Sequence, residues 1–308
     1  MDIVFMGTPE FSVPCLKRLI SDGHRVSGVF TQPDKPKGRG NIMTPPPVKV
    51  EALKNGIPVF QPMSMKDGTA LDILKKLSPE LIIVTAYGKI LPKEILFYPK
   101  YGCINIHASL LPKYRGAAPI QWSVINGEKK TGVTSMQMNE GLDTGDMLLS
   151  DEIEIGENDN AGVVHDKLSE LGAEVMSKTI DALLKGELRP VKQDDSLSNY
   201  APMLTKELCP VDWSRPASEV HNMIRGLSPW PVAVTTVDGK PVKLHESRLC
   251  DITGGREGEV VECTGSLVIS CGDKKCVEIL KIQAQGKKAM SAADYLRGNR
   301  MEKGTICK

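Results

Sequence analysis

The chain has 308 residues, of which 41% are apolar and 25% charged, and its formal net charge is +1. This length exceeds the usual size of one domain, and the apolar content is sufficient for two cores, so we expect two domains. No apolar run is long enough to cross a membrane and the first residues lack a signal-peptide pattern, which predicts a cytoplasmic protein with no membrane partner. The eight cysteines form no C-x-x-C pair, and we expect no metal site.

In the first part of the chain, short apolar strands alternate with helix-like stretches. Strands are predicted at residues 3–6, 26–30, 81–85 and 102–107, with helices at 13–21 and 72–77 among them. This order is typical of an α/β domain with a largely parallel, Rossmann-like sheet. A long amphipathic helix is predicted for residues 161–185, where Gly186 ends it.

A polar, proline-marked stretch at residues 189–206 predicts a linker between a first domain (1–188) and a second (207–308). After a helix near 218–225, the second domain shows strands at 232–237, 242–247, 258–262, 267–270 and 276–283. Glycine-rich turns separate them, as expected of a small β-barrel.

Charge is unevenly distributed along the chain. Residues 274–308 contain nine Lys and Arg against three Asp and Glu, although the chain as a whole is nearly neutral. A basic tail is compatible with contact to an RNA backbone and equally with a solvated surface.

The stretch that begins at Asn105 carries the strongest chemical signal. Asn105, His107 and Ser109 alternate with small or apolar residues, so a strand would project them to one side, and Pro112 then ends the strand at an exposed edge. Asp143 lies in a later glycine-rich loop that could return a carboxylate to the histidine. An amide, an imidazole and a carboxylate suit the attack of a neutral amine on an acyl carbon, because the first two can stabilise an oxyanion and the third can hold an imidazolium.

An isolated Asn-x-His pair is more often an ordinary set of hydrogen-bonded polar groups at the end of a sheet. The whole block, from Asn105 through Pro112 and Arg115-Gly116 to Asp143-x-Gly145, resembles the signature of the folate-dependent formyltransferases. The resemblance covers nearly the whole chain, including the segments at 3–11, 86–92, 201–207 and 229–231. In that superfamily the residues at positions 105, 107 and 143 are catalytic.

The resemblance also implies substrates and contacts. It implies transfer of a formyl group from 10-formyltetrahydrofolate to the α-amine of methionine on initiator tRNA, by a monomer with an OB-like second domain that helps to hold the tRNA. The implied folate pocket consists of Tyr87, Gly88, Ile90, Leu91, Ser109, Leu110, Leu111 and Pro112. The basic loop at 31–41, which could otherwise be a plain surface insertion, would bind the tRNA acceptor stem through Lys35, Lys37 and Arg39.

Two alternatives remain open from the sequence. A formyltransferase acting on a small amine or a sugar nucleotide would keep the same three residues, although the basic loop and the second domain argue against it. A non-enzymatic RNA-binding barrel protein would explain the basic tail but would leave Asn105, His107 and Asp143 without a purpose.

Overall fold

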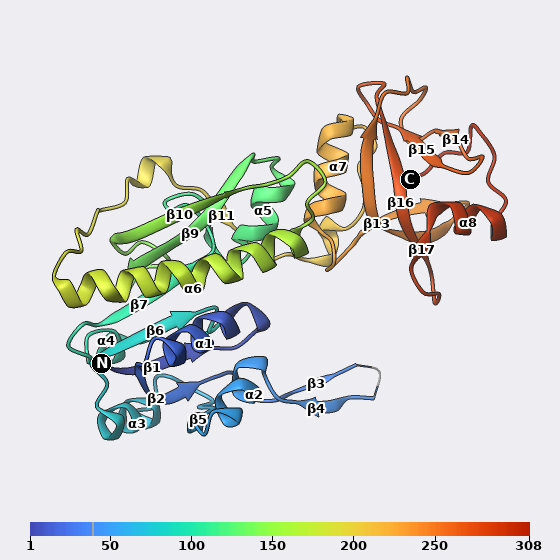
Figure 1. Cartoon of the computed structure of the whole chain (residues 1–308). Helices are drawn as coiled ribbons and strands as arrows, with labels where there is room; N and C mark the ends of the chain where they lie inside the picture. Colours follow the sequence, from blue (N-terminus) through green and yellow to red (C-terminus); the bar gives the residue numbers. More distant parts are fainter. Residues whose placement is uncertain (39) are drawn as a thin grey trace. The chain divides into compact units, whose positions relative to one another are not determined.

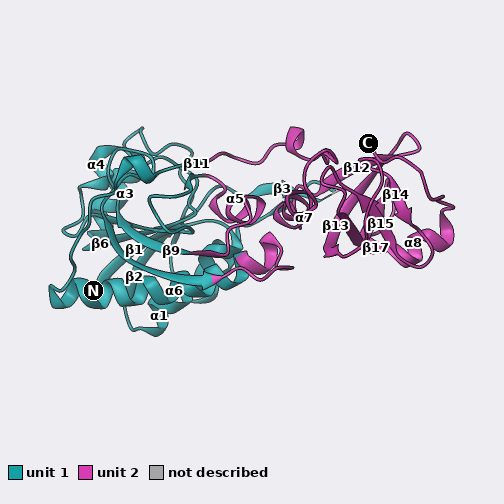
Figure 2. Ribbon diagram, turned by 90° about the horizontal axis from the view of Figure 1, so that it is seen from above, with its two compact units in different colours: residues 1–116, 132–153, 165–200 teal, residues 117–131, 154–164, 201–308 magenta. Residues whose placement is uncertain are grey.

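The computed structural model describes residues 1–38 and 40–308, and their contacts divide the chain into two compact units (Figure 2). Unit 1 comprises residues 1–116, 132–153 and 165–200, and unit 2 comprises 117–131, 154–164 and 201–308. Residues 117–131 and 154–164 therefore pack with the C-terminal region. The domain boundaries expected from the sequence, 1–188 and 207–308 with a linker between them, concern which parts of the chain fold independently. They stay a prediction.

Unit 1 is built on a seven-stranded sheet with the order β10-β9-β7-β6-β1-β2-β5 (Figure 1). Its central neighbours β2, β1, β6 and β7 run parallel, and β9 joins β7 antiparallel. The central strands are almost continuously apolar and buried, as parallel strands covered on both faces require. The strands are β1 (Asp2–Gly7), β2 (Arg25–Phe30), β5 (Val59–Phe60), β6 (Leu81–Thr85), β7 (Cys103–His107), β9 (Lys130–Gln137) and β10 (Met147–Glu154).

The longest helix, α6 (Ala161–Lys185), has the predicted bounds, and Gly186 follows it with a left-handed φ of 71°. Its Ser169 hydroxyl donates to the Phe11 carbonyl at 2.8 Å, and Thr179 and Ser135 share a 2.7 Å hydrogen bond. The helix is thus fixed to the rest of unit 1 by polar contacts as well as by apolar packing. The other helices before residue 117 are η1 (Glu10–Ser12), α1 (Val13–Ser21), α2 (Pro47–Lys54), α3 (Thr69–Leu77) and α4 (Lys93–Leu96).

Unit 2 contains a curled antiparallel sheet with the order β12-β13-β16-β15-β14, and β17 pairs with β16. Bulges near Glu246 bend the long strand β13, which favours curling of the sheet. The predicted fold class, a parallel α/β sheet followed by a smaller barrel-like β domain, is confirmed. The strands are β12 (Ala233–Val237), β13 (Lys240–Cys250), β14 (Val260–Glu262), β15 (Leu267–Ser270), β16 (Cys276–Ala284) and β17 (Met290–Ser291).

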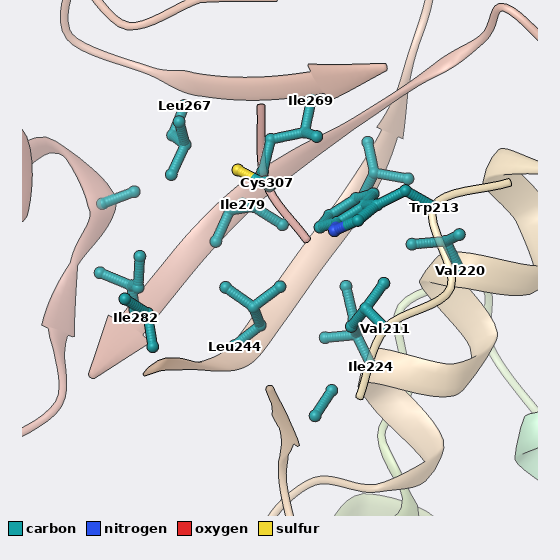
Figure 3. Close-up of a cluster of buried hydrophobic side chains, with 14 of the residues drawn as sticks. Val211, Trp213, Val220, Ile224, Leu244, Leu267, Ile269, Ile279, Ile282 and Cys307 are labelled. Atoms are coloured by element: carbon teal, nitrogen blue, oxygen red, sulfur yellow. The ribbon is translucent and has the colours of Figure 1, made fainter. Parts of the chain in front are cut away.

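The core of unit 2 joins this sheet to helix α7 (Ala217–Gly226) (Figure 3). Val220 and Ile224, one turn apart on α7, are fully buried with Leu244 of β13. The Trp213 indole packs in the same cluster and donates to the Thr235 hydroxyl at 3.0 Å. Two further helices belong to this unit, α5 (Pro119–Ile125) and α8 (Ala292–Gly298). The short helix η3 (Lys206–Leu208) belongs to it as well.

Helix α7 also holds the loop at residues 156–159. His221 is buried, with Nδ1 2.9 Å from the Ser247 hydroxyl and Nε2 3.0 Å from the Glu157 carbonyl oxygen. The Arg225 guanidinium donates to the carbonyls of Gly156 and Asp159 at 3.1 and 2.9 Å. Main-chain oxygens therefore satisfy a buried cation and a buried ring.

The segment after α6 returns to unit 1. Met147 and Val191 form an isolated antiparallel bridge, and β11 (Tyr200–Ala201) pairs with β8 (Arg115–Gly116) after the short helix η2 (Asp195–Leu197). Within the described part of the chain, no helix is long and apolar enough to cross a membrane.

Candidate active site

Strand β7 places Asn105 and His107 two residues apart, so both side chains leave the same face, as predicted. Neighbouring strands hold its backbone, with Asn105 opposite Val84 of β6 and Met136 of β9. Asn105 is half-buried, whereas the other residues of the strand are buried. Among residues 1–38 and 40–308 its side-chain amide has no hydrogen-bond partner, which leaves the amide available to a ligand.

The His107 ring lies between two protein oxygens. Its Nε2 is 2.9 Å from the Tyr114 carbonyl oxygen, and its Nδ1 is 3.8 Å from Oδ2 of Asp143. A carbonyl can only accept, so Nε2 carries a hydrogen whether the ring is neutral or charged. The other ring nitrogen, Nδ1, faces the carboxylate.

Asp143 is held in the loop between β9 and β10. Its φ of 52° lies in the left-handed region, and its Oδ2 accepts a hydrogen bond from the Gly116 amide at 2.9 Å. Two residues on, a Cβ at Gly145 would lie 1.7 Å from the Gln137 carbonyl oxygen, so only glycine fits there. The predicted return of this carboxylate to His107 is what the structure shows.

The turn after β7 contains the predicted folate residues 109–112. The buried Ser109 hydroxyl donates to the Lys113 carbonyl at 2.7 Å, so it serves the turn itself. Thr134 of β9 ties the turn to the sheet: its hydroxyl donates to the Ser109 carbonyl and accepts from the Leu111 amide. The Leu111–Pro112 peptide bond is cis.

The other predicted folate residues lie after β6 and point in different directions. Tyr87 is 2% exposed and Leu91 is buried in the same apolar cluster, and burial raises the pKa of the Tyr87 hydroxyl. Ile90, by contrast, is 77% exposed. The Gln32 amide donates to the carbonyls of Tyr87 and Gly88 at 3.2 and 3.0 Å, so Gln32 fixes this backbone.

Two open cavities lie in unit 1 beside these residues. One, of about 530 Å³, is lined by Gly88 and Ile90 together with Gln32 and Lys35. The second, of about 540 Å³, includes Lys35 again and Lys37. Predicted folate and tRNA residues thus meet at the first cavity, whereas the side chains at 105, 107 and 143 line neither of these two.

The predicted tRNA loop is a β-hairpin of β3 (Lys35–Lys37) and β4 (Ile42–Thr44), with Lys35 and Lys37 exposed. Its base is anchored at Asp34, where Lys49 and Gln61 each donate at 2.8 Å. The hydrogen bonds from Lys49 and then Gln61 lower the pKa of the Asp34 carboxyl. The third predicted contact, Arg39, lies outside the described residues.

Sequence reasoning missed three supporting groups: the Tyr114 carbonyl, the Gly116 amide and the Gln193 side chain, which donates to the Asp143 carbonyl at 2.8 Å. The first two are main-chain groups, so the identity of the side chain at those positions does not reveal them. Gln193 stands in the polar stretch that predicted a linker. Among the described residues, no group of three or more His, Cys, Asp or Glu could hold a metal ion.

Two family models match the chain. Residues 1–180 match the model described as formyl transferase, and residues 203–300 match the formyl transferase C-terminal domain. The methionyl-tRNA formyltransferase of Caldanaerobacter subterraneus subsp. tengcongensis is 52% identical to this chain, and the match covers 100% of both chains. The enzyme of that name from Alkaliphilus oremlandii is 50% identical, with 99% of both chains covered.

Solved structures agree in fold. The N-formyltransferase from Helicobacter canadensis, in complex with folinic acid and dTDP-3-aminofucose, superimposes with a TM-score of 0.71 at 20% identity. The match covers 92% of this chain and 98% of that one. The two family models and the full-length identity to the curated relatives show that the chain belongs to the formyltransferase family, in the group of the methionyl-tRNA formyltransferases.

Proposed function

We propose that this enzyme transfers the formyl group of 10-formyltetrahydrofolate to the α-amine of methionyl-initiator tRNA. The product is N-formylmethionyl-tRNA for translation initiation. The observation that carries the proposal is identity of about half of all residues, over the full length, to enzymes named for this reaction. The pairing of His107 with Asp143 on the same side of the sheet as the half-buried Asn105 amide supports it, because these groups suit acyl transfer to an amine.

Each of the three side chains has a distinct role. Asn105 donates a hydrogen bond to the formyl oxygen as negative charge develops there, a contact whose removal from other enzymes costs roughly 3 kcal/mol. His107, in its imidazolium form, stabilises the same negative charge. The Asp143 carboxylate favours this form by holding a proton at Nδ1. The amine nitrogen bonds to the formyl carbon, the bond from that carbon to folate nitrogen breaks, and the proton of the amine reaches that nitrogen through water.

The folate would lie against backbone groups of Tyr87 and Gly88, the exposed Ile90, and the turn at residues 109–112. The main chain there is held rigidly by Gln32 and Thr134, as recognition of the amide-like edge of a pterin requires. Leu91 and the Tyr87 ring, both buried, shape this wall from behind. Folinic acid in the solved structure from Helicobacter canadensis supports a folate as the formyl donor.

The tRNA would be held as a polyanion by Lys35 and Lys37 on the hairpin, by Arg39 as the resemblance implies, and by the second domain. Exposed lysines on a projecting hairpin suit contact with phosphates. The basic residues at 274–308 add positive charge to unit 2. We expect the enzyme to act as a monomer in the cytoplasm.

The test compares formyl acceptors on one preparation of enzyme. With 10-formyltetrahydrofolate, methionyl-initiator tRNA should be formylated, whereas free methionine, glycinamide ribonucleotide and amino sugar nucleotides should not. Preferred formylation of a small amine would replace the proposed acceptor while keeping the reaction type. No formylation of any acceptor, by a protein that binds tRNA, would favour a non-enzymatic role.

The roles of the side chains are tested by Asn105→Ala and His107→Ala, each expected to lower turnover at least ~100-fold without unfolding. Asn55→Ala is the matched control, since that amide is exposed and, among the described residues, donates to Glu51 alone, at the end of α2. Near-normal turnover in folded His107→Ala protein would remove His107 from the mechanism.

A further inference from the structure

We propose that Gln193 is a positioning residue that fixes the loop carrying Asp143, an inference that rests on the catalytic role proposed above for Asp143. Gln193 is 50 residues away from Asp143 in sequence and stands in the polar stretch after α6. The structure makes this stretch part of the site.

The amide nitrogen of Gln193 binds the loop. Its Nε2 donates to the Asp143 carbonyl at 2.8 Å and to the Gly145 carbonyl at 2.7 Å. An amide has two N–H groups, so both are used on one turn. The two carbonyls that flank Thr144 are thereby held by one side chain.

The amide oxygen of Gln193 is held in turn by Arg115. The guanidinium donates to Oε1 from Nε at 3.0 Å and from Nη2 at 2.8 Å. The same Nη2 lies 2.7 Å from Oδ1 of Asp195. The Arg115 side chain is only 12% exposed, so a mainly buried cation fixes the direction of the Gln193 amide.

These contacts close a ring around Asp143. Arg115 holds Gln193, Gln193 holds the Asp143 main chain, and the neighbouring Gly116 amide binds the Asp143 carboxylate at 2.9 Å. Asp143 is therefore held at both its backbone and its side chain by the strand Arg115–Gly116. Its φ of 52° is a conformation that side-chain-bearing residues adopt rarely, so it needs such support.

A glutamine is suited to this position because it presents two donors and an acceptor at one fixed distance from the backbone. Glutamate keeps the acceptor for Arg115 but cannot donate to the two carbonyls. Methionine has a similar length and makes neither set of bonds. Gln193→Glu therefore removes only the hydrogen bonds to the loop carbonyls, whereas Gln193→Met also removes the hydrogen bond from Arg115.

The test measures formyl transfer to methionyl-tRNA by Gln193→Glu and Gln193→Met. We expect kcat to fall about 10- to 100-fold through misplacement of Asp143, with KM for tRNA changed less than about twofold. Asn55→Asp is the matched control: its Nδ2 also donates to a main-chain carbonyl, of Glu51 at 2.8 Å, and it is none of the residues assigned to catalysis or to substrate binding. That variant should keep wild-type kcat.

A double-mutant cycle decides whether Gln193 acts through Asp143. In the Asp143→Asn background, Gln193→Glu should have little further effect on kcat. If Asp143→Asn is impaired but Gln193→Glu and Gln193→Met are fully active, or lower kcat equally in both backgrounds, the positioning role is wrong. If Asp143→Asn turns over normally, the proposed role of Asp143 is wrong, and the inference falls with it.

Discussion

The hydrogen bond from Nε2 of His107 to the Tyr114 carbonyl determines what the ring can do. It leaves Nδ1 facing Oδ2 of Asp143, 3.8 Å away. That distance exceeds a direct hydrogen bond, so the resting pair interacts mainly through charge. The carboxylate is nevertheless ordered, because the Gly116 amide binds the same oxygen that faces the ring.

Asp143→Asn tests the charge separately from the shape. The amide oxygen of asparagine can still accept from Gly116, so the loop should keep its conformation, whereas the support for a protonated His107 is lost. We expect kcat to fall at least ~100-fold with little change in melting temperature. Steady-state kinetics and thermal unfolding measure both effects.

Asp151→Asn serves as the control for that variant, since Asp151 is paired with Lys178 at 3.1 Å on the edge strand β10. It should remain fully active. A fully active Asp143→Asn protein would show that the negative charge is dispensable.

The chemistry of the site was predictable from the sequence to the extent that side chains carry it. Asn105, His107 and Asp143 were identified by residue type within a characteristic block, and the structure brings His107 and Asp143 together. The partners that orient them were not predictable. The Tyr114 carbonyl and the Gly116 amide are main-chain groups: every residue type supplies the carbonyl, and every type but proline supplies the N–H.

At the scale of elements, helix α7 holds the loop at 156–159 through a buried histidine. Burial lowers the pKa of His221; the backbone hydrogen bond to Glu157 opposes this shift, and the charge of Arg225 adds to it. The folded pKa thus lies below the ordinary value of 6.5. As pH falls through that value, the unfolded chain takes up the proton first, so stability present above about pH 6.5 is lost toward acid.

His221→Gln removes this titration while keeping a polar group that can bond Ser247. We expect the wild-type midpoint of urea unfolding to fall between pH 7.5 and pH 5.5 by more than that of the variant. His24, whose pKa burial also lowers, is present in both proteins and cancels in the comparison. Equal decreases in the two proteins would contradict a buried neutral His221.

The hairpin β3–β4 supports a second prediction at this scale. Replacing Lys35 and Lys37 together by Ala should weaken tRNA use most at low salt and reduce the salt slope of log K by about one for each lost phosphate contact. Binding of a folate analogue, measured by fluorescence, should not change. Lys178→Ala, on helix α6, is the control for loss of a surface lysine.

A parallel loss of folate binding would instead place Lys35 in the folate pocket. That outcome is meaningful because Lys35 lines the same cavity as Gly88 and Ile90.

Strong periodicity made β1, β2, β6 and β7 of the first sheet and β12 to β16 of the second predictable, together with α1, α3, α6 and α7, whereas β5, β10 and β17 were not predicted. Shorter elements without a clear period were missed. In helix α5, Gln121 and Ser123 interrupt a short apolar run, and α2 begins at the third of three consecutive prolines, which suggest a loop. Their helical form depends on burial against other segments, which a local pattern does not contain.

At the scale of the whole molecule, the two units interleave in sequence. Residues 117–131 and 154–164 belong to unit 2, although they lie within the range of the N-terminal family model. Helix α5 approaches α7 closely: a Cβ at Gly226 would lie 2.4 Å from Cγ1 of Ile125. Loss of packing in unit 2 should therefore reach segments that are distant in sequence.

Ile224→Ala tests this interleaving, since Ile224 is fully buried in the core of unit 2 and its truncation should cost roughly 2–5 kcal/mol. By hydrogen exchange with mass spectrometry, peptides covering 119–125 and 154–164 should lose protection together with α7. Peptides from β1 and β6 of unit 1 should keep theirs. Equal acceleration in β1 and β6 would indicate a single cooperative unit.

The contact between α7 and the loop at 156–159 has a consequence for how this protein tolerates variation. His221 and Arg225 bind carbonyl oxygens of the loop, and none of those bonds depends on the side chains of Glu157 or Asn158. Asn158 is free to diverge or to be randomised in a library, whereas Glu157 places a negative charge near Arg225 and α7 must keep its histidine and arginine. Tags or labels attached at residue 158 should accordingly be accepted without loss of folding.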